Sequence, residues 1–159
     1  MAVTKGLDLY LKDHLAGATG GSELAAKLCA DHPDGPLGAF LAELSRDIDQ
    51  DKETLQVLMH SLGVEPGAIK QAGAWLGEKV SRLKLTDAFT GSPELKRLLQ
   101  FEMLALGIEG KGELWRSLTA VAKSALVIDA DLEALTRRAE NQRAGLEAHR
   151  LEAARAALV

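Results

Sequence analysis

The sequence predicts an all-α protein, a bundle of four long helices with one long crossover connection. Ala, Leu, Glu, Lys and Arg dominate its 159 residues, and runs of β-branched residues are absent. In four segments, apolar residues recur at alternating three- and four-residue steps, which is the spacing of one helix face. Two of the three connections between these segments are short, whereas the middle one is long. Together these observations favour a helical bundle and give no sign of a sheet.

The first two helices are expected at about residues 4–30 and 36–62. The turn sequence DHPDGP separates them and breaks the helical pattern. Gly63 follows the second helix as a candidate C-cap. Because the connecting turn is short, the two helices are expected to be antiparallel neighbours.

The last two long helices are expected at about residues 93–122 and 129–157. Ser92 is the expected N-cap of the first of these, with Pro93 at its first helical position. The long middle connection is expected to hold a short crossover helix at 66–82. A helix followed by extended chain can span the length of the bundle, so the second and third long helices can run in the same direction.

A polar layer is predicted at mid-height, because a polar residue interrupts each apolar face. His14 and Asp51 lie at equal distances along the chain from the first turn, and Glu109 and Gln142 do so from the last. Buried ionisable groups are costly unless they are paired or bound to a metal. The predicted polar core layer is therefore His14, Asp51, Glu109 and Gln142.

Two interpretations of this layer stay open. A His–Asp pair and a Glu–Gln pair, hydrogen-bonded with a trapped water, would satisfy all the groups and fix the register of the helices. Alternatively, iron or manganese could be bound by His14, Asp51, Glu102 and Glu109, because helical bundles hold metals through carboxylates and imidazoles on facing helices. We expect the first arrangement, which needs no cofactor.

The segments YLKDHLAGATGGSELA, LGIEGKGELW and RAENQRAGLEAHRLEAAR resemble a group of small bacterial ferritin-like proteins, over nearly the whole chain. The resemblance implies the one-crossover bundle of the ferritin-like superfamily. Its di-iron members place Glu on the first and third helices and Glu-x-x-His on the second and fourth. Glu102 or Glu109 matches the third-helix position. However, the second helix offers Asp47-x-x-Gln50, and arginine replaces histidine on the fourth, so an intact di-iron site is not expected.

Three glycines interrupt the first helix, in LAGATGG, and three more interrupt the third long helix, in LGIEGKG. Each costs a helix about 1 kcal/mol relative to alanine. They could mark close approach of the two helices, space vacated for water or a small ligand, or a helix break at Gly20-Gly21. We expect close approach around the polar layer, with Gly17, Gly21, Gly107 and Gly110 as the close-packing residues.

Composition argues against several classes of partner and places the chain in the cytoplasm. The net charge is −4, and the basic residues are interleaved with acidic ones, which does not favour nucleic-acid binding. No apolar run approaches the length of a membrane span, so no membrane partner is expected. The single cysteine, Cys29, cannot form an internal disulfide, as is usual in a reducing cytoplasm.

The predicted function is that of a structural, binding or interaction module, with no catalytic residues assigned, because the sequence carries no nucleophile elbow, phosphate loop or zinc cysteine pair. One alternative is a divergent iron- or manganese-binding oxidase or peroxide-handling protein. Another is a binder of a small apolar ligand in the space left by the glycines. A homodimer is kept among the candidate partners, because the C-terminal AARAALV could dock on a second copy.

Overall fold

The computed structural model describes residues 3–66, 92–122 and 127–159. In this part of the chain there are four α-helices and no strand: α1 (Lys5–Asp31), α2 (Gly35–Ser61), α4 (Pro93–Ala122) and α5 (Leu132–Leu158). The all-α prediction is confirmed, and each of these helices begins and ends within three residues of its predicted bounds. The predicted crossover helix at 66–82 lies outside the described residues, except for its first residue. None of the described helices is long and apolar enough to cross a membrane.

Local hydrogen bonds explain where the helices begin and end. Thr4, Ser92 and Asp131 precede α1, α4 and α5, and each side-chain oxygen accepts a hydrogen bond from the backbone N–H three residues later. These bonds satisfy backbone donors that have no partner within the helix, and the bond to Ser92 confirms the predicted N-cap. Gly63, just after α2, has a φ of 70°, a conformation that glycine adopts without the steric cost of a Cβ.

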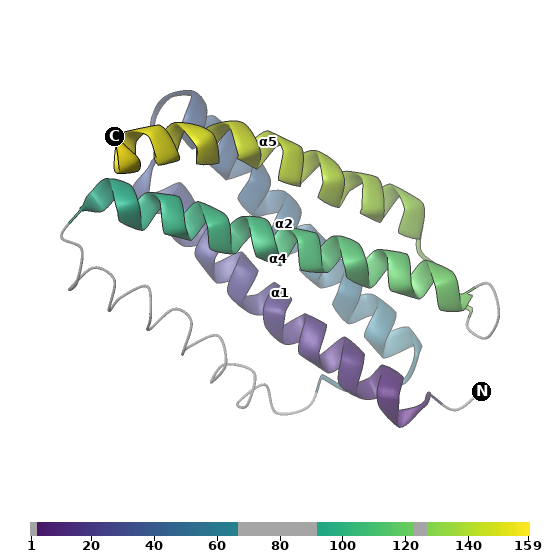
Figure 1. Ribbon diagram of the computed structural model, residues 1–159. Helices are drawn as coiled ribbons and strands as arrows, with labels where there is room; N and C mark the ends of the chain where they lie inside the picture. The colour runs from purple at the N-terminus through teal and green to yellow at the C-terminus, as the bar shows by residue number, and fades with distance from the viewer. Residues whose placement is uncertain (1–2, 67–91, 123–126) are drawn as a thin grey trace.

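The four helices form a bundle in which α4 has two neighbours. Figure 1 shows that α1 and α2 run antiparallel, that α4 and α5 run antiparallel, and that α2 and α4 point in the same direction. The helix α4 packs against both α5 and α1, whereas α2 packs against α1 and contacts α5 more sparsely. Side chains on different faces of α4 therefore reach different parts of the bundle interior.

The apolar core is divided into two clusters, one toward each end of the bundle. On α2, the first cluster ends at Ile48 and the second begins at Leu55. On α4, the corresponding boundary lies between Ile108 and Leu114. The predicted polar residues and glycines lie in the mid-height zone between the two clusters. This zone is the candidate site.

Candidate functional site

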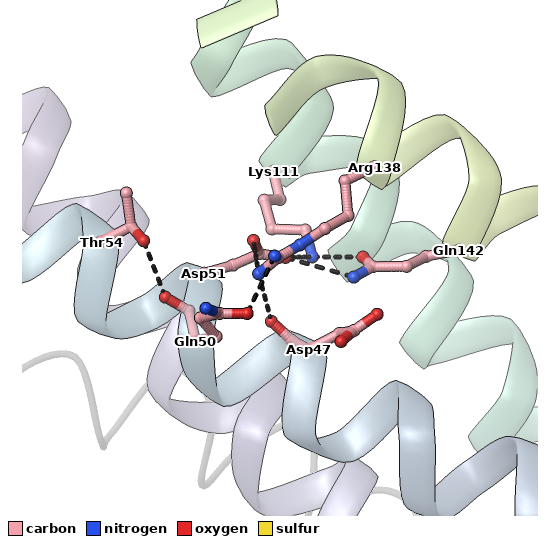
Figure 2. Close-up of polar contacts among 7 residues, drawn as sticks. All are labelled: Asp47, Gln50, Asp51, Thr54, Lys111, Arg138 and Gln142. Atoms are coloured by element: carbon pink, nitrogen blue, oxygen red, sulfur yellow. Dashed lines mark hydrogen bonds and ion pairs between the residues drawn. The ribbon is translucent and has the colours of Figure 1, made fainter. Parts of the chain in front are cut away.

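A buried carboxylate, Asp51, joins three helices at mid-height (Figure 2). Its side chain, which α2 directs into the bundle, is 1% exposed. Its Oδ2 accepts hydrogen bonds from Lys111 Nζ of α4 at 2.5 Å and from Gln142 Nε2 of α5 at 3.3 Å. The same Lys111 ammonium also donates to Gln142 Oε1. Asp51, Lys111 and Gln142 therefore form a closed set of mutual hydrogen bonds.

A second cation, Arg138 of α5, pairs with the other carboxylate oxygen of Asp51. Its Nη2 lies 2.6 Å from Asp51 Oδ1, an ion pair whose angles do not meet hydrogen-bond geometry, so this oxygen accepts no hydrogen bond from the described residues. The guanidinium instead donates to Gln50 Oε1 at 2.9 Å and to the backbone oxygen of Asp47 at 3.1 Å. These two bonds hold Arg138 against α2. We call Asp51, Lys111, Arg138 and Gln142 the charged cluster.

Burial sets the electrostatics of the charged cluster. Desolvation lowers the pKa of Lys111 below its usual value, because a buried ammonium loses its hydration. The charge of Asp51 and its hydrogen bond oppose this shift, and the charge of Asp47 does so from farther away. Lys111 and Arg138 thus share one fully buried carboxylate. The half-buried Asp47 acts on Lys111 from farther away, so its negative charge balances the remaining positive charge only in part.

Two of the four predicted layer residues, Asp51 and Gln142, do meet in this cluster. The prediction for Glu109 is wrong, since its side chain is 54% exposed and lies 3.6 Å from Arg116. Lys111 takes the inward position on α4 instead. Two residues correspond to about 200° around a helix, so positions 109 and 111 cannot both face the same neighbours.

The sequence contains a pattern that predicts an inward-facing position for Lys111. Leu104, Ile108, Trp115 and Leu118 are the buried α4 residues at three- and four-residue spacing, and position 111 completes their series. Arg138 has no equally simple signal, because its long side chain reaches the cluster from the edge of the buried face of α5.

The remaining predicted residues, His14 and Glu102, do not contact Asp51 through any hydrogen bond or ion pair among the described residues. The His14 ring packs edge-on against Tyr10, with 4.5 Å between ring centroids. Glu102 lies 3.4 Å from Arg150 of α5. Both residues line a pocket that Asp51 and Lys111 also border.

The predicted metal ligands are not gathered into one site. Within residues 3–66, 92–122 and 127–159, no three His, Cys, Asp or Glu side chains are placed to share a metal ion. Of the predicted set, Asp51 is held by two cations, and Glu109 is turned outward. The donor set expected for iron or manganese is therefore not formed by these four side chains.

A pocket of about 570 Å³ lies between α1 and α4, with part of its wall from α2, next to the charged cluster. The charged cluster borders it through Asp51 and Lys111. Five glycines line it, Gly17, Gly20 and Gly21 from α1 and Gly107 and Gly110 from α4. Its other walls are mainly apolar, and they include Leu24, Ile48, Leu55, Met103, Leu106 and Leu114.

The glycines leave open space rather than allow close contact. A Cβ added at Gly17, Gly21, Gly107 or Gly110 would meet no atom within 4 Å among the described residues beyond the glycine's own neighbours and helix backbone. The prediction that these four residues permit close packing of the helices is therefore wrong. The alternative of a helix break at Gly20-Gly21 is also wrong, because α1 continues through both residues.

His14 is the imidazole on the pocket wall. Burial lowers its pKa below 6.5, and the neighbouring charge of Asp13 partly opposes the shift. A neutral imidazole, a buried ammonium and apolar walls together suit a small molecule that is largely apolar and carries a polar group at one end.

Protein-family models, curated proteins and solved structures gave no match to this chain. The arrangement of its own residues is accordingly the basis for assigning a function.

Proposed function

We propose that this chain is a binding module that holds a small, largely apolar molecule in the pocket between α1 and α4. The main observation behind the proposal is that four glycines from two different helices line one pocket, and that no other described atom occupies the place of their missing side chains. Each of these glycines costs its helix about 1 kcal/mol relative to alanine. A ligand-binding role of the empty space would explain why the chain keeps glycines that destabilise its helices.

The size and walls of the pocket support the same proposal. Its volume, about 570 Å³, falls within the range of roughly 300–1,000 Å³ that is usual for small-molecule sites. Such sites are mainly apolar and contain a few polar groups that orient the ligand. In this pocket His14, Asp51 and Lys111 are among the polar groups, and the rest of the wall is mainly apolar, although it also includes Asp13, Lys52 and Glu102.

We further propose that the scaffold is a ferritin-like bundle without a di-iron centre, in the cytoplasm. The shared direction of α2 and α4 in Figure 1 supports the one-crossover topology. At mid-height, where the di-iron proteins of that superfamily hold metal, this chain has the cations Lys111 and Arg138 on one carboxylate. The single cysteine, Cys29, supports a reducing compartment.

Titration with Nile red, a neutral dye that fluoresces in apolar surroundings, tests the binding function. The wild type should bind the dye saturably. The variant Gly17→Leu should bind it at least about tenfold more weakly, because a leucine side chain at this position fills part of the pocket.

The matched control is Gly6→Leu, a glycine-to-leucine change on the same helix. Gly6 does not line the pocket, and an added Cβ there would come no closer than 3.9 Å, to Thr4 Oγ1. This control should bind the dye like the wild type, and circular dichroism should show equal helix content in all three proteins. Absence of saturable binding by the wild type, or equal binding by Gly17→Leu, would overturn the proposal.

A further inference from the structure

The charged cluster carries more positive than negative charge next to the pocket. Asp51 is the only carboxylate within ion-pair distance of Lys111 or of Arg138 in the described part of the chain. Two cations thus contact a single carboxylate, so the cluster has one positive charge in excess; Arg138 is 29% exposed to water, and Asp47 acts on Lys111 only from a distance. A buried excess charge is unfavourable unless an opposite charge approaches it.

Of the two cations, Lys111 is the one that faces the pocket. Its side chain is 13% exposed and belongs to the pocket wall, whereas Arg138 does not line the pocket. An ammonium has three N–H groups, and here two of them donate to Asp51 and Gln142. The third has no acceptor among the described residues, so it is free to meet an acceptor on a bound molecule.

The other charged groups of the pocket wall are already paired or exposed. Lys52 donates to Ser22 and pairs with Asp49 at 3.1 Å. Glu102 lies 3.4 Å from Arg150, and Asp13 is exposed to solvent. Lys111 is therefore the buried charge of the pocket wall that can gain most from a ligand of opposite charge.

We propose that the molecule bound between α1 and α4 carries a carboxylate head group, which pairs with Lys111 while its apolar body lies along the glycine-lined wall. This inference rests on the proposed function of the pocket. A cationic head group would be repelled by the charge excess, and a neutral head group would leave that excess uncompensated. A carboxylate accepts a charge-assisted hydrogen bond from the free N–H of Lys111 and reduces the buried positive charge at the same time.

Three ligands that share one alkyl chain, octanoate, octanol and octylamine, separate the contribution of the head group from that of the apolar body. Each is titrated calorimetrically into the wild type and is used to displace Nile red. Octanoate should bind at least about tenfold more tightly than octanol, as a charge-assisted hydrogen bond predicts, and octylamine should bind most weakly. Equal affinity for octanoate and octanol, or failure of octanoate to displace bound dye, would overturn this inference and leave the pocket itself established. No binding of Nile red or of any of the three would instead overturn the proposed function.

The variant Lys111→Met tests whether Lys111 is the group that recognises the carboxylate. It leaves Asp51 balanced by Arg138, so the protein keeps one buried ion pair. Its preference for octanoate over octanol should disappear. The matched control is Lys52→Met, which removes the other lysine of the pocket wall. The inference fails if Lys111→Met keeps the preference, or if Lys52→Met is the variant that loses it.

Discussion

The two sides of α4 at mid-height differ in what fills them. Toward α2 and α5, Lys111 enters a dense cluster of charges and hydrogen bonds around Asp51. Toward α1, Gly107 and Gly110 face a pocket in which the opposing helix also presents glycines. One helix, within about a single turn, thus builds both a tightly held polar contact and an empty space.

Substitutions on the two sides of α4 should therefore change stability in different ways. Both cations of the charged cluster depend on the buried Asp51, so removing this carboxylate leaves them without their partner. On the glycine side nothing depends on the missing side chains, so small additions should be tolerated or even favourable. We therefore expect substitutions in the charged cluster to lower the free energy of unfolding and small additions at the glycines to raise it.

The largest effect is expected for Asp51→Ala. The variant leaves the largely buried Lys111 and the partly exposed Arg138 without their shared carboxylate, and it should lower the free energy of unfolding by about 3–5 kcal/mol. Asp49→Ala is the control on the same helix, because the Asp49 side chain is 48% exposed, and its ion pair should contribute at most about 1 kcal/mol. Urea unfolding followed by circular dichroism measures both. Similar losses for the two variants would contradict a special role of the charged cluster.

A smaller loss is expected for Gly38→Ala, a glycine outside the pocket. A Cβ at this position would lie 2.6 Å from backbone atoms of Pro33, which cannot move without shifting the turn before α2. The variant should lose about 1–3 kcal/mol of stability, as overpacked sites do. Thermal unfolding should show a lower Tm than the wild type. An unchanged Tm would mean that the turn before α2 can shift to accommodate the added Cβ at little energetic cost.

The glycine side should respond with the opposite sign. Gly17→Ala adds a methyl group that meets no described atom within 4 Å, and it also removes the cost of an interior glycine. We expect a gain of about 1 kcal/mol in the same urea experiment. A loss of stability would indicate that α1 and α4 do approach closely at this height, and the pocket would then be absent in solution.

The smallest effect concerns pH and His14. Because burial lowers the pKa of His14, the unfolded chain takes up a proton at a higher pH than the folded protein does. The folded state should therefore lose stability as the pH falls below 6.5, until His14 is protonated in the folded state as well. His32, whose pKa is lowered chiefly by burial and next by Arg97, contributes in the same direction.

The variant His14→Gln should weaken this loss of stability between neutral and mildly acidic pH, without abolishing it, because His32 remains. The matched control is the same substitution at the exposed His60. An identical pH profile for the wild type and His14→Gln would show that His14 is not desolvated.

The helices were predictable from sequence because their signals are local. The spacing of apolar residues defines each buried face. Ser92 directly precedes α4, and its hydroxyl oxygen accepts a hydrogen bond from the backbone N–H of Leu95. The meeting of Asp51 with Gln142 was also within reach, since distance from the connecting turns sets the height of each residue in an antiparallel pair.

The identity of the inward residue on α4 was missed because that helix has two neighbours. A helix that packs on both α1 and α5 has a wide buried face, and a polar residue near its edge can be assigned to the wrong side. Glu109 was such a residue, whereas Lys111 lies in register with Ile108 and Trp115.

The open space beside the glycines could not be predicted from their presence in the sequence. A glycine pattern is the same whether two helices touch or stand apart, because the distance between the helices is set by larger side chains elsewhere along them. In this bundle the two apolar clusters, with Leu15 and Trp115 on one side and Leu24 and Ile108 on the other, flank the pocket. The packing of those clusters determines the role of the glycines.

A crystal structure determined under xenon pressure would show whether the space between α1 and α4 is open, because xenon enters apolar cavities without needing a specific ligand. We expect xenon density between α1 and α4, beside Gly17 and Gly107, in the wild type. The density at that place should be weaker in Gly17→Leu crystals and unchanged in Gly6→Leu crystals. Wild-type crystals in which α1 and α4 close on each other at these glycines, with no xenon between them, would contradict the proposed pocket.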